Sequence, residues 1–435
     1  MTKQGKRRVD VITLGCSKNL VDSEFLIRQF EGGGFTVEHD SPNPSGEIVV
    51  INTCGFIGDA KEESIDTILD FVEAKKDGRI NKLYVMGCLS ERYFDLLGKE
   101  LPEVDHFYGK FNWKELIADL GSTFRPDLVN ERSLTTPGHY AYLKISEGCN
   151  RSCSYCAIPI ITGKHKSKPM EELVEEARFL ASHGVKELQV IAQDLSYYGL
   201  DLYKKQMLAP LVEKLSQIEG IEWIRLHYAY PAAFPMDVLD VMANNPKVCA
   251  YMDIALQHIS DNMLKLMKRH VTRADTIQLV QTMREKVPGI HLRTTMITGH
   301  PGETEADFEE LLEFVKEMRF ERLGVFPYSH EEDTFAWKNY QDDTSQEEKQ
   351  ARADEIMALQ RDISRGINET KVGKILKVII DRKEDDFFIG RSEFDSPEVD
   401  PEVLIPISEE VKPGHFYQVQ ITEAEDYDLY GRVLR

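Results

Sequence analysis

The first third of the chain alternates short apolar runs with amphipathic stretches. Three of the apolar runs end at a cysteine, and residues 64–74 between them carry hydrophobic side chains at helical spacing. This alternation is typical of a parallel sheet with crossover helices. Because the carboxyl ends of parallel strands share one edge, where open α/β folds bind ligands, we expect the three cysteines to converge there. They are Cys16, Cys54 and Cys88.

A second α/β pattern follows an interruption at residues 130–140, where turn-forming residues replace the periodic pattern. Six strand candidates alternate with helical stretches beyond this point. They lie at 141–146, 187–194, 223–230, 248–257, 290–299 and 322–329. Six units are too few for a complete eight-stranded barrel, so the pattern predicts an open or partial (β/α)6 barrel whose active edge is the carboxyl end of its strands.

The last part of the chain begins with a long helix over 344–369, for which Thr344 or Ser345 is the expected N-cap. Several short strand-like segments follow, broken by Gly, Pro and Asp, and they predict a small antiparallel β-barrel. The chain is thus α/β with three expected domains, at 1–134, 135–368 and 369–435.

Composition and charge restrict the class of protein. A chain of 435 residues exceeds one comfortable core, and its 42% hydrophobic and 29% charged residues are ordinary for a soluble globular protein. The formal net charge of −21 argues against a broad nucleic-acid surface and favours a basic partner. Residues 370–435 hold nine Lys and Arg against fifteen Asp and Glu, a net charge of −6, so this unit is also poorly suited to phosphates.

The sequence shows no apolar run of eighteen residues, and its basic start lacks the hydrophobic segment of a signal peptide. We therefore expect a cytoplasmic protein without membrane contact.

Seven cysteines are an odd number, and three of them form a CxxxCxxC run, which favours metal or redox chemistry over disulfides. These three are Cys149, Cys153 and Cys156. Thiolates suit iron–sulfur clusters and zinc, but a structural zinc site normally has four ligands. A 4Fe-4S cluster on three cysteines leaves one iron open to an external ligand. The alternative is a zinc site completed by His165, nine residues beyond the last thiol.

The CxxxCxxC run, with the aromatic Tyr155 before its last cysteine and a place after the first barrel strand, resembles the signature of radical S-adenosylmethionine (SAM) enzymes. Further segments, including "TLGCSKNLVDSE", "INTCGFI", "GCLSERY" and "ITGHPGETEADFEEL", resemble the methylthiotransferases within that superfamily, and the resemblance extends over nearly the whole chain. The C-terminal unit resembles a TRAM domain.

Two of these segments, "GCSKNLVDSE" and "YSHEEDT", resemble the branch that methylthiolates the β-carbon of an aspartate in small-subunit ribosomal protein twelve. That protein is basic, which suits the acidic C-terminal unit. The alternative is the MiaB-like branch, which acts on adenosine in tRNA and usually has a different residue pair after the first cysteine. We expect a monomer that meets nucleic acid only indirectly, through the ribosome, and the resemblance leaves the electron donor open.

The resemblance implies two 4Fe-4S clusters and SAM. Cys149, Cys153 and Cys156 would hold the cluster at which one electron splits SAM to methionine and a 5′-deoxyadenosyl radical, which then takes a hydrogen from the β-carbon of the aspartate. The second cluster, which carries the sulfur to be methylated by another SAM, would be held by Cys16, Cys54 and Cys88.

Further residues are candidates for contact with SAM. Gln193 would meet its polar end, Arg293 could pair with its carboxylate, and the turn at Gly299 with Glu303 could let the backbone approach the adenine. Tyr155 and Gln257 complete this set.

Simpler explanations remain open for several of these residues. Taken alone, cysteines at strand ends are more often buried packing residues, which is our interpretation of Cys249. His227 and His300 could be structural histidines, and Glu303 could occupy the first turn of a helix. Residues 330–343 are expected to be a solvated acidic loop. The remaining functional alternative, an electron-transfer module without SAM chemistry, predicts four protein ligands for each cluster.

Overall fold

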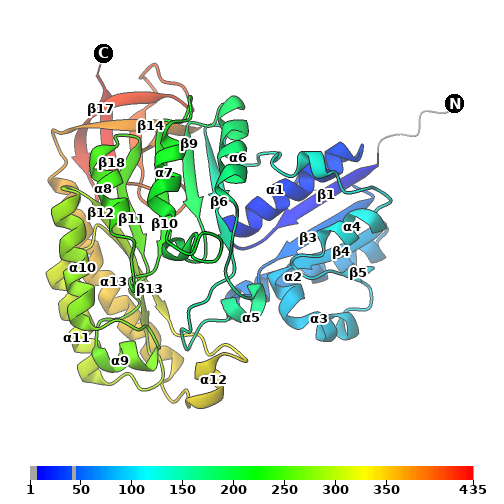
Figure 1. The fold of residues 1–435 in the computed structure, drawn as a ribbon, viewed down its shortest axis with the longest axis horizontal. Helices are drawn as coiled ribbons and strands as arrows, with labels where there is room; N and C mark the ends of the chain where they lie inside the picture. The colour runs from blue at the N-terminus through cyan, green and yellow to red at the C-terminus, as the bar shows by residue number, and fades with distance from the viewer. Residues whose placement is uncertain (1–6, 42–45, 435) are drawn as a thin grey trace.

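The computed structural model describes residues 7–41 and 46–434, which form three units in chain order (Figure 1). The first unit is a five-stranded parallel sheet in the order β2-β1-β3-β4-β5. Its strands are β1 (Arg8–Thr13), β2 (Thr36–His39), β3 (Ile48–Thr53), β4 (Lys82–Gly87) and β5 (His106–Phe107). All six residues of β3 are buried, as expected for a central strand covered on both faces. The sheet predicted from the alternating pattern is confirmed.

Two hydrophobic clusters, one on each face, hold the helices of this unit against the sheet. Leu26 and Phe30 of one helix and Leu116 of another belong to the first cluster, whereas Ile68 and Leu97 of two further helices belong to the second. The helices are α1 (Ser17–Gly32), α2 (Gly58–Lys76), α3 (Cys88–Glu100) and α4 (Trp113–Asp119). Because α1 and α4 cover one face and α2 and α3 the other, the carboxyl edge of the strands stays free for a site.

The central unit is a six-stranded parallel sheet in the order β13-β12-β11-β10-β9-β6. Its strands are β6 (Tyr140–Lys144), β9 (Glu187–Ile191), β10 (Trp223–Ala229), β11 (Val248–Ile254), β12 (His291–Thr298) and β13 (Arg322–Pro327). In the described part of the chain β6 and β13 do not pair with each other, so the barrel stays open, as its six units predict.

Helices cover the outside of this sheet (Figure 1). They are α6 (Met170–Ser182), α7 (Leu208–Ser216), α8 (Asp237–Asn244), α10 (Arg273–Lys286), α11 (Glu305–Met318) and α13 (Gln346–Glu369). The short helices α9 (Asp261–Leu266) and α12 (Phe335–Asn339) lie at the lower end of this unit in Figure 1. Thr304 and Asp307 form a capping box that starts α11. Of the two expected N-caps of α13, Ser345 is the one whose side chain accepts from a backbone N–H, that of Glu348.

The C-terminal unit is a closed five-stranded barrel in the order β14-β15-β16-β18-β17. Its strands are β14 (Ile375–Glu384), β15 (Phe387–Ser392), β16 (Val403–Pro406), β17 (Phe416–Ala424) and β18 (Leu429–Val433). The prediction of a small antiparallel barrel is confirmed except for one pair, since β16 and β18 run parallel. The hairpin of β17 and β18 closes the barrel by laying β18 beside β16, and this leaves no unpaired edge.

The C-terminal barrel packs on the amino ends of the central strands. Trp223, near the start of β10, contacts Phe416, and the buried carboxylate of Glu187 at the start of β9 accepts from Arg391 at 2.8 Å. Figure 1 shows this barrel at the end of the molecule opposite α9 and α12. The described residues contain no helix long and apolar enough to span a bilayer.

Candidate active site

The three N-terminal thiols follow three neighbouring strands. Cys16 directly precedes α1, Cys54 follows β3, and Cys88 is the first residue of α3 after β4. An added Cβ at Gly15, where φ is 90°, would lie 2.8 Å from Cys54 Sγ, so the chain before Cys16 runs beside the Cys54 thiol. The structure therefore brings these cysteines to one sheet edge, as the strand pattern predicts, while their role as ligands stays a prediction.

The surroundings of the three thiols shift their pKa values in different directions. Around Cys16 the surrounding atoms partly exclude water, which favours the thiol, but Lys18, Lys110 and two backbone N–H groups at the start of α1 outweigh this and lower its pKa. Burial raises the pKa of Cys54, and it raises that of Cys88 to about 12, with the other two thiols adding to the effect. Because each thiolate disfavours the next, a polycationic centre would stabilise all three together.

The second set of thiols lies in the loop between β7 (Ser146–Glu147) and α5 (Ile158–Thr162). This loop is on the carboxyl side of β6 and begins at Gly148, where φ is 75°. An added Cβ there would lie 2.3 Å from the Lys164 carbonyl oxygen, so only glycine fits. The backbone N–H of Arg151 donates to Cys149 Sγ at 3.4 Å. Burial raises the pKa of Cys149 to about 11, and burial together with Cys153 raises the pKa of Cys156.

Neither set has the geometry of a site for a single ion. Within the described residues, no group of three or more His, Cys, Asp or Glu side chains is arranged to hold one metal ion. The ligands of one zinc would all lie about 2.3 Å from a common centre, whereas the cube of a 4Fe-4S cluster presents a separate iron to each thiolate. His165, the proposed fourth zinc ligand, instead places its Nε2 3.0 Å from Ser167 Oγ.

A cationic cage that the sequence analysis missed surrounds Cys153. The buried Arg269 directs Nη1 to Cys153 Sγ at 3.5 Å and donates to Tyr155 Oη at 3.1 Å. The Tyr230 ring contacts two guanidiniums, since those of Arg269 and Arg151 both lie 4.1 Å from its centroid. The cage can stabilise negative charge on this thiolate without supplying a ligand. Its only sequence signal was Arg151, a charged residue inside the cysteine loop.

An interdomain ion network, made of Asp22, Lys110, Lys144 and Glu147, lies between the two sets of thiols. Lys110 Nζ lies 3.8 Å from Cys88 Sγ and 3.1 Å from Asp22. Lys144 of β6 pairs with Asp22 and, at 2.8 Å, with Glu147, two residues before Cys149. Burial opposes ionisation of Asp22, but the two lysines lower its pKa to about 2. These opposite charges fix α1 against β6 and so set how the two sheet edges face each other.

Two predicted SAM-contacting glutamines have unused acceptors. Gln193 donates to Glu147 at 2.5 Å, but its Oε1 is buried without a hydrogen-bond partner among the described residues. Gln257, which has a left-handed φ of 73°, also carries a buried Oε1 without a partner there. Unsatisfied buried acceptors are costly, so both suit a ligand that brings N–H donors. Tyr155 lies between the Arg269 guanidinium and the His300 ring.

The other predicted contacts already have partners in the protein. Arg293 pairs with Asp253 at 3.1 Å and with Asp400 of the β15–β16 loop at 3.3 Å. Glu303 is buried and accepts from Gly299 N at 2.7 Å, from His258 and from Arg352. Gly299 has a φ of 72° and packs against Lys349. A structural role in this turn accounts for Glu303, and contacts of Arg293, Gly299 and Glu303 with SAM stay predictions.

The expectation of a solvated loop over 330–343 is wrong at its start. Glu331 is buried and pairs with Lys61 of α2 and Arg92 of α3, in both cases at 2.8 Å. Arg92 also donates to the backbone carbonyl of Glu332. The loop after β13 therefore binds the N-terminal unit, and the acidic residues that suggested solvent exposure are used in this contact.

Three residues with open alternatives have structural surroundings. His227 lies 2.7 Å from Gln189, and burial lowers its pKa. His300 is buried, with Nε2 3.1 Å from Ser154 Oγ. Cys249 packs with Trp223 against the C-terminal barrel, as its interpretation as a packing residue predicts.

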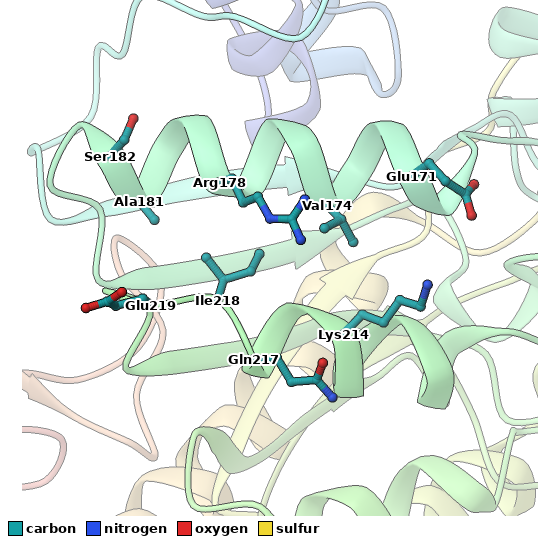
Figure 2. A pocket seen from close by; sticks show the side chains of 9 residues that line it. All are labelled: Glu171, Val174, Arg178, Ala181, Ser182, Lys214, Gln217, Ile218 and Glu219. Carbon is teal, nitrogen blue, oxygen red and sulfur yellow. The ribbon is translucent and has the colours of Figure 1, made fainter.

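A groove of about 670 Å³ lies away from the thiols, between α6 and α7 on the outside of the barrel (Figure 2). Arg178 and Lys214 reach into it from the two helices, and Ile218 lies at its floor. It contains no residue of either thiol set.

Comparison with known proteins divides the chain in the same way as its sheets. The family model of the Radical SAM superfamily matches residues 143–315, that of the TRAM domain matches 372–434, and that of "Uncharacterized protein family UPF0004" matches 8–109. A solved structure of the radical SAM methyltransferase TsrM from Kitasatospora setae is similar at a TM-score of 0.55 and 15% identity, and covers 74% of this chain and 73% of that one. At this identity the likeness concerns the fold.

Curated relatives match over nearly the whole length. The protein from Bacteroides thetaiotaomicron is 64% identical over 430 residues, which are 99% of both chains, and that from Phocaeicola vulgatus is 63% identical over 99% of this chain and 100% of its own. A relative from Cytophaga hutchinsonii is 54% identical and covers 99% of this chain and 98% of its own. All three are named "Ribosomal protein uS12 methylthiotransferase RimO". The chain therefore belongs to the RimO family of radical SAM methylthiotransferases.

Proposed function

We propose that the chain replaces one hydrogen on the β-carbon of an aspartate in ribosomal protein uS12 by a methylthio group. The observation that carries the proposal is the pair of three-cysteine edges, one after β1, β3 and β4 and one after β6, joined by the interdomain ion network. Relatives that are 62–64% identical over the full chain carry the name of this activity.

Two 4Fe-4S clusters and SAM fit the residues present. Each set offers three soft thiolates, which suit an iron–sulfur cluster, and the unpaired buried acceptors of Gln193 and Gln257 suit the ammonium group of SAM. When bound in this way, the clusters supply the electron that splits SAM and the sulfur that is transferred. Cys149, Cys153 and Cys156 would hold the first cluster and Cys16, Cys54 and Cys88 the second.

The remaining residues of the site bind, orient and exclude water. Arg269 and Tyr230 stabilise the thiolate of Cys153, and Lys110 does the same for Cys88. Glu331, in the loop after β13, pairs with Arg92 of α3 and so holds the central unit against the N-terminal unit. The exclusion of water matters here because it prevents side reactions of a radical intermediate.

The tRNA alternative finds less support. The C-terminal unit carries a net charge of −6, and the relatives are named for a ribosomal protein. An acidic surface repels the phosphate backbone but attracts a basic protein. We expect the enzyme to act as a cytoplasmic monomer that meets nucleic acid only through the ribosome.

The test is anaerobic reconstitution with iron and sulfide, followed by incubation with SAM, a strong reductant and either uS12 or tRNA. We expect methylthiolation of the uS12 aspartate, detected by mass spectrometry, and none of tRNA. Modification of tRNA alone would reject the proposal. Cys16→Ala and Cys153→Ala should each retain about half of the iron, because each removes one anchor of only one cluster. Cys249→Ala is the matched control and should retain all of it.

A further inference from the structure

Lys18 connects the two units at the level of the thiols. It lies in the first turn of α1, two residues after Cys16, and its ammonium group lies 3.4 Å from the centroid of the Tyr228 ring. Tyr228 is the second-last residue of β10, at the carboxyl side of the barrel. One side chain of the N-terminal unit thus reaches the mouth of the barrel.

The residue that Lys18 contacts has a constrained backbone conformation. Tyr228 has a φ of 65°, a left-handed conformation that aromatic residues adopt only when the fold enforces it. Burial lowers the pKa of His227 and raises that of Asp253, and the positive charge of Lys18 adds a smaller effect that acts with burial at His227 and against it at Asp253. The ammonium group therefore lies between the N-terminal thiol set and the carboxyl side of the barrel.

Two cations near the thiols, Lys18 and Arg269, have no carboxylate of the described residues within 4.0 Å, and Arg269 directs its N–H groups to Cys153, Tyr155 and the Ala255 carbonyl. Four other cations near the thiols each have an acidic partner. The pairs are Lys110 with Asp22, Lys144 with Glu147, Arg151 with Asp194, and Arg293 with Asp253. The ring of Tyr228 holds the Lys18 ammonium group by a cation–π contact, which leaves N–H donors available for an anion.

The proposed substrate brings an anion to this place. The β-carbon of an aspartate is bonded directly to its carboxylate carbon, so the carboxylate must enter the same cavity as the reacting atom. A carboxylate buried without a cation is costly, and Asp22 and Glu147 already add negative charge nearby. We propose that Lys18 binds the carboxylate of the target aspartate and so selects aspartate over asparagine. The inference rests on the proposed function.

The experiment combines enzyme and substrate variants. Wild type, Lys18→Met and Lys18→Arg are each titrated with fluorescently labelled uS12 and with uS12 in which the target aspartate is replaced by asparagine. We expect Lys18→Met to weaken binding of the aspartate form about tenfold or more, the factor of one lost hydrogen bond between charged groups, and to leave binding of the asparagine form unchanged. The same variant should raise KM for uS12 more than it lowers kcat, and Lys18→Arg should restore most of the affinity.

Two controls separate binding from damage to the fold or the clusters. Lys114→Met removes another lysine that lies over an aromatic ring, that of Phe124, but away from the thiols, and it should bind both substrates as wild type does. Iron content and SAM cleavage without uS12 should be unchanged in Lys114→Met and Lys18→Arg, and both are measured in Lys18→Met because Lys18 also lowers the pKa of Cys16. If Lys18→Met loses iron, Lys18→Arg and Lys18→Gln are compared instead, because only the first keeps the positive charge. Lys18→Gln should then bind the aspartate form of uS12 more weakly than Lys18→Arg does, and the asparagine form equally well.

The outcomes distinguish the inference from the proposed function. If wild type cleaves SAM but does not modify uS12, both are wrong. If wild type modifies uS12 and the loss of charge at Lys18 affects the aspartate and asparagine forms equally, the inference alone is wrong.

Discussion

The Glu331 carboxylate accepts a hydrogen bond from the Arg92 guanidinium at 2.8 Å, and both side chains are almost fully buried. Arg92 lies on α3, which begins at Cys88, whereas Glu331 belongs to the loop after β13. A buried ion pair therefore joins the two thiol-bearing units at their common rim.

Glu331→Gln should weaken this contact between the N-terminal and central units. The change leaves Arg92 and Lys61 without the carboxylate they share, which costs about 3 kcal/mol for a buried pair. We expect faster amide hydrogen exchange in α3 and in residues 329–334, and a methylthiolation rate that falls about tenfold while SAM cleavage without substrate continues. The control is Glu332→Gln, because that side chain is exposed and, among the residues that the structure describes, accepts from Tyr93 alone. Equal effects of both variants would contradict a role for the buried pair.

Arg269→Met should lower the reduction potential of the cluster held by the barrel thiols. A cation beside Cys153 Sγ stabilises the more negative, reduced state, and a charged hydrogen bond is worth about 1.5–3 kcal/mol. We therefore expect a decrease of about 60–130 mV in a one-electron redox titration followed by electron paramagnetic resonance. Lys265→Met, which removes an exposed charge of nearby α9, should shift the potential much less. An unchanged potential in Arg269→Met would show that the arginine serves only packing.

Local sequence predicted the sheets and the position of both thiol sets, because a buried parallel strand followed by a cysteine places that cysteine at a known edge. Cys54 after β3 and Cys88 after β4 are examples. The same reasoning could not find Arg269 or Lys110, which are 116 and 22 residues from the thiols they contact. Most charged residues are solvated, and only tertiary packing decides which few are buried against a thiol.

One error of the sequence analysis and one detail that it did not predict have the same cause. The acidic pattern of 330–343 matches an exposed loop, yet Glu331 is buried because Lys61 and Arg92 of another unit lie opposite it. Likewise, strand patterns do not reveal that β16 and β18 run parallel, since direction follows from how the barrel closes. Both are contacts between segments far apart in the chain.

Gly148→Ala should remove the barrel cluster selectively. The left-handed φ of 75° and the Lys164 carbonyl oxygen 2.3 Å from an added Cβ force the cysteine loop to move. We expect the variant to lose about half of its iron and its SAM cleavage, because the N-terminal thiols are not disturbed. Gly138→Ala is the matched control, since its added Cβ meets nothing within 4 Å. Full iron content in Gly148→Ala would contradict the strain argument.

Lys371 should make stability depend on pH in the alkaline range. It is buried after α13, and burial, with a smaller effect of Arg322, lowers its pKa to about 8. The unfolded chain, in which a lysine has a pKa of about 10.4, then binds more protons than the folded chain between these two values. Stability must therefore rise with pH over this range, by up to about 3 kcal/mol for this group. Because raised tyrosine pKa values act in the opposite direction above about pH 10, the comparison of variants is more informative than the wild-type curve alone.

Thermal unfolding at pH 7 to 10 should show that Lys371→Met is relatively most stable at pH 7 and loses this advantage as the pH rises. Lys374→Met, which removes a nearby exposed lysine, should follow wild type in parallel. A constant difference between wild type and Lys371→Met would mean that the buried lysine keeps its proton throughout, with Asp395 stabilising the charge more strongly than burial disfavours it.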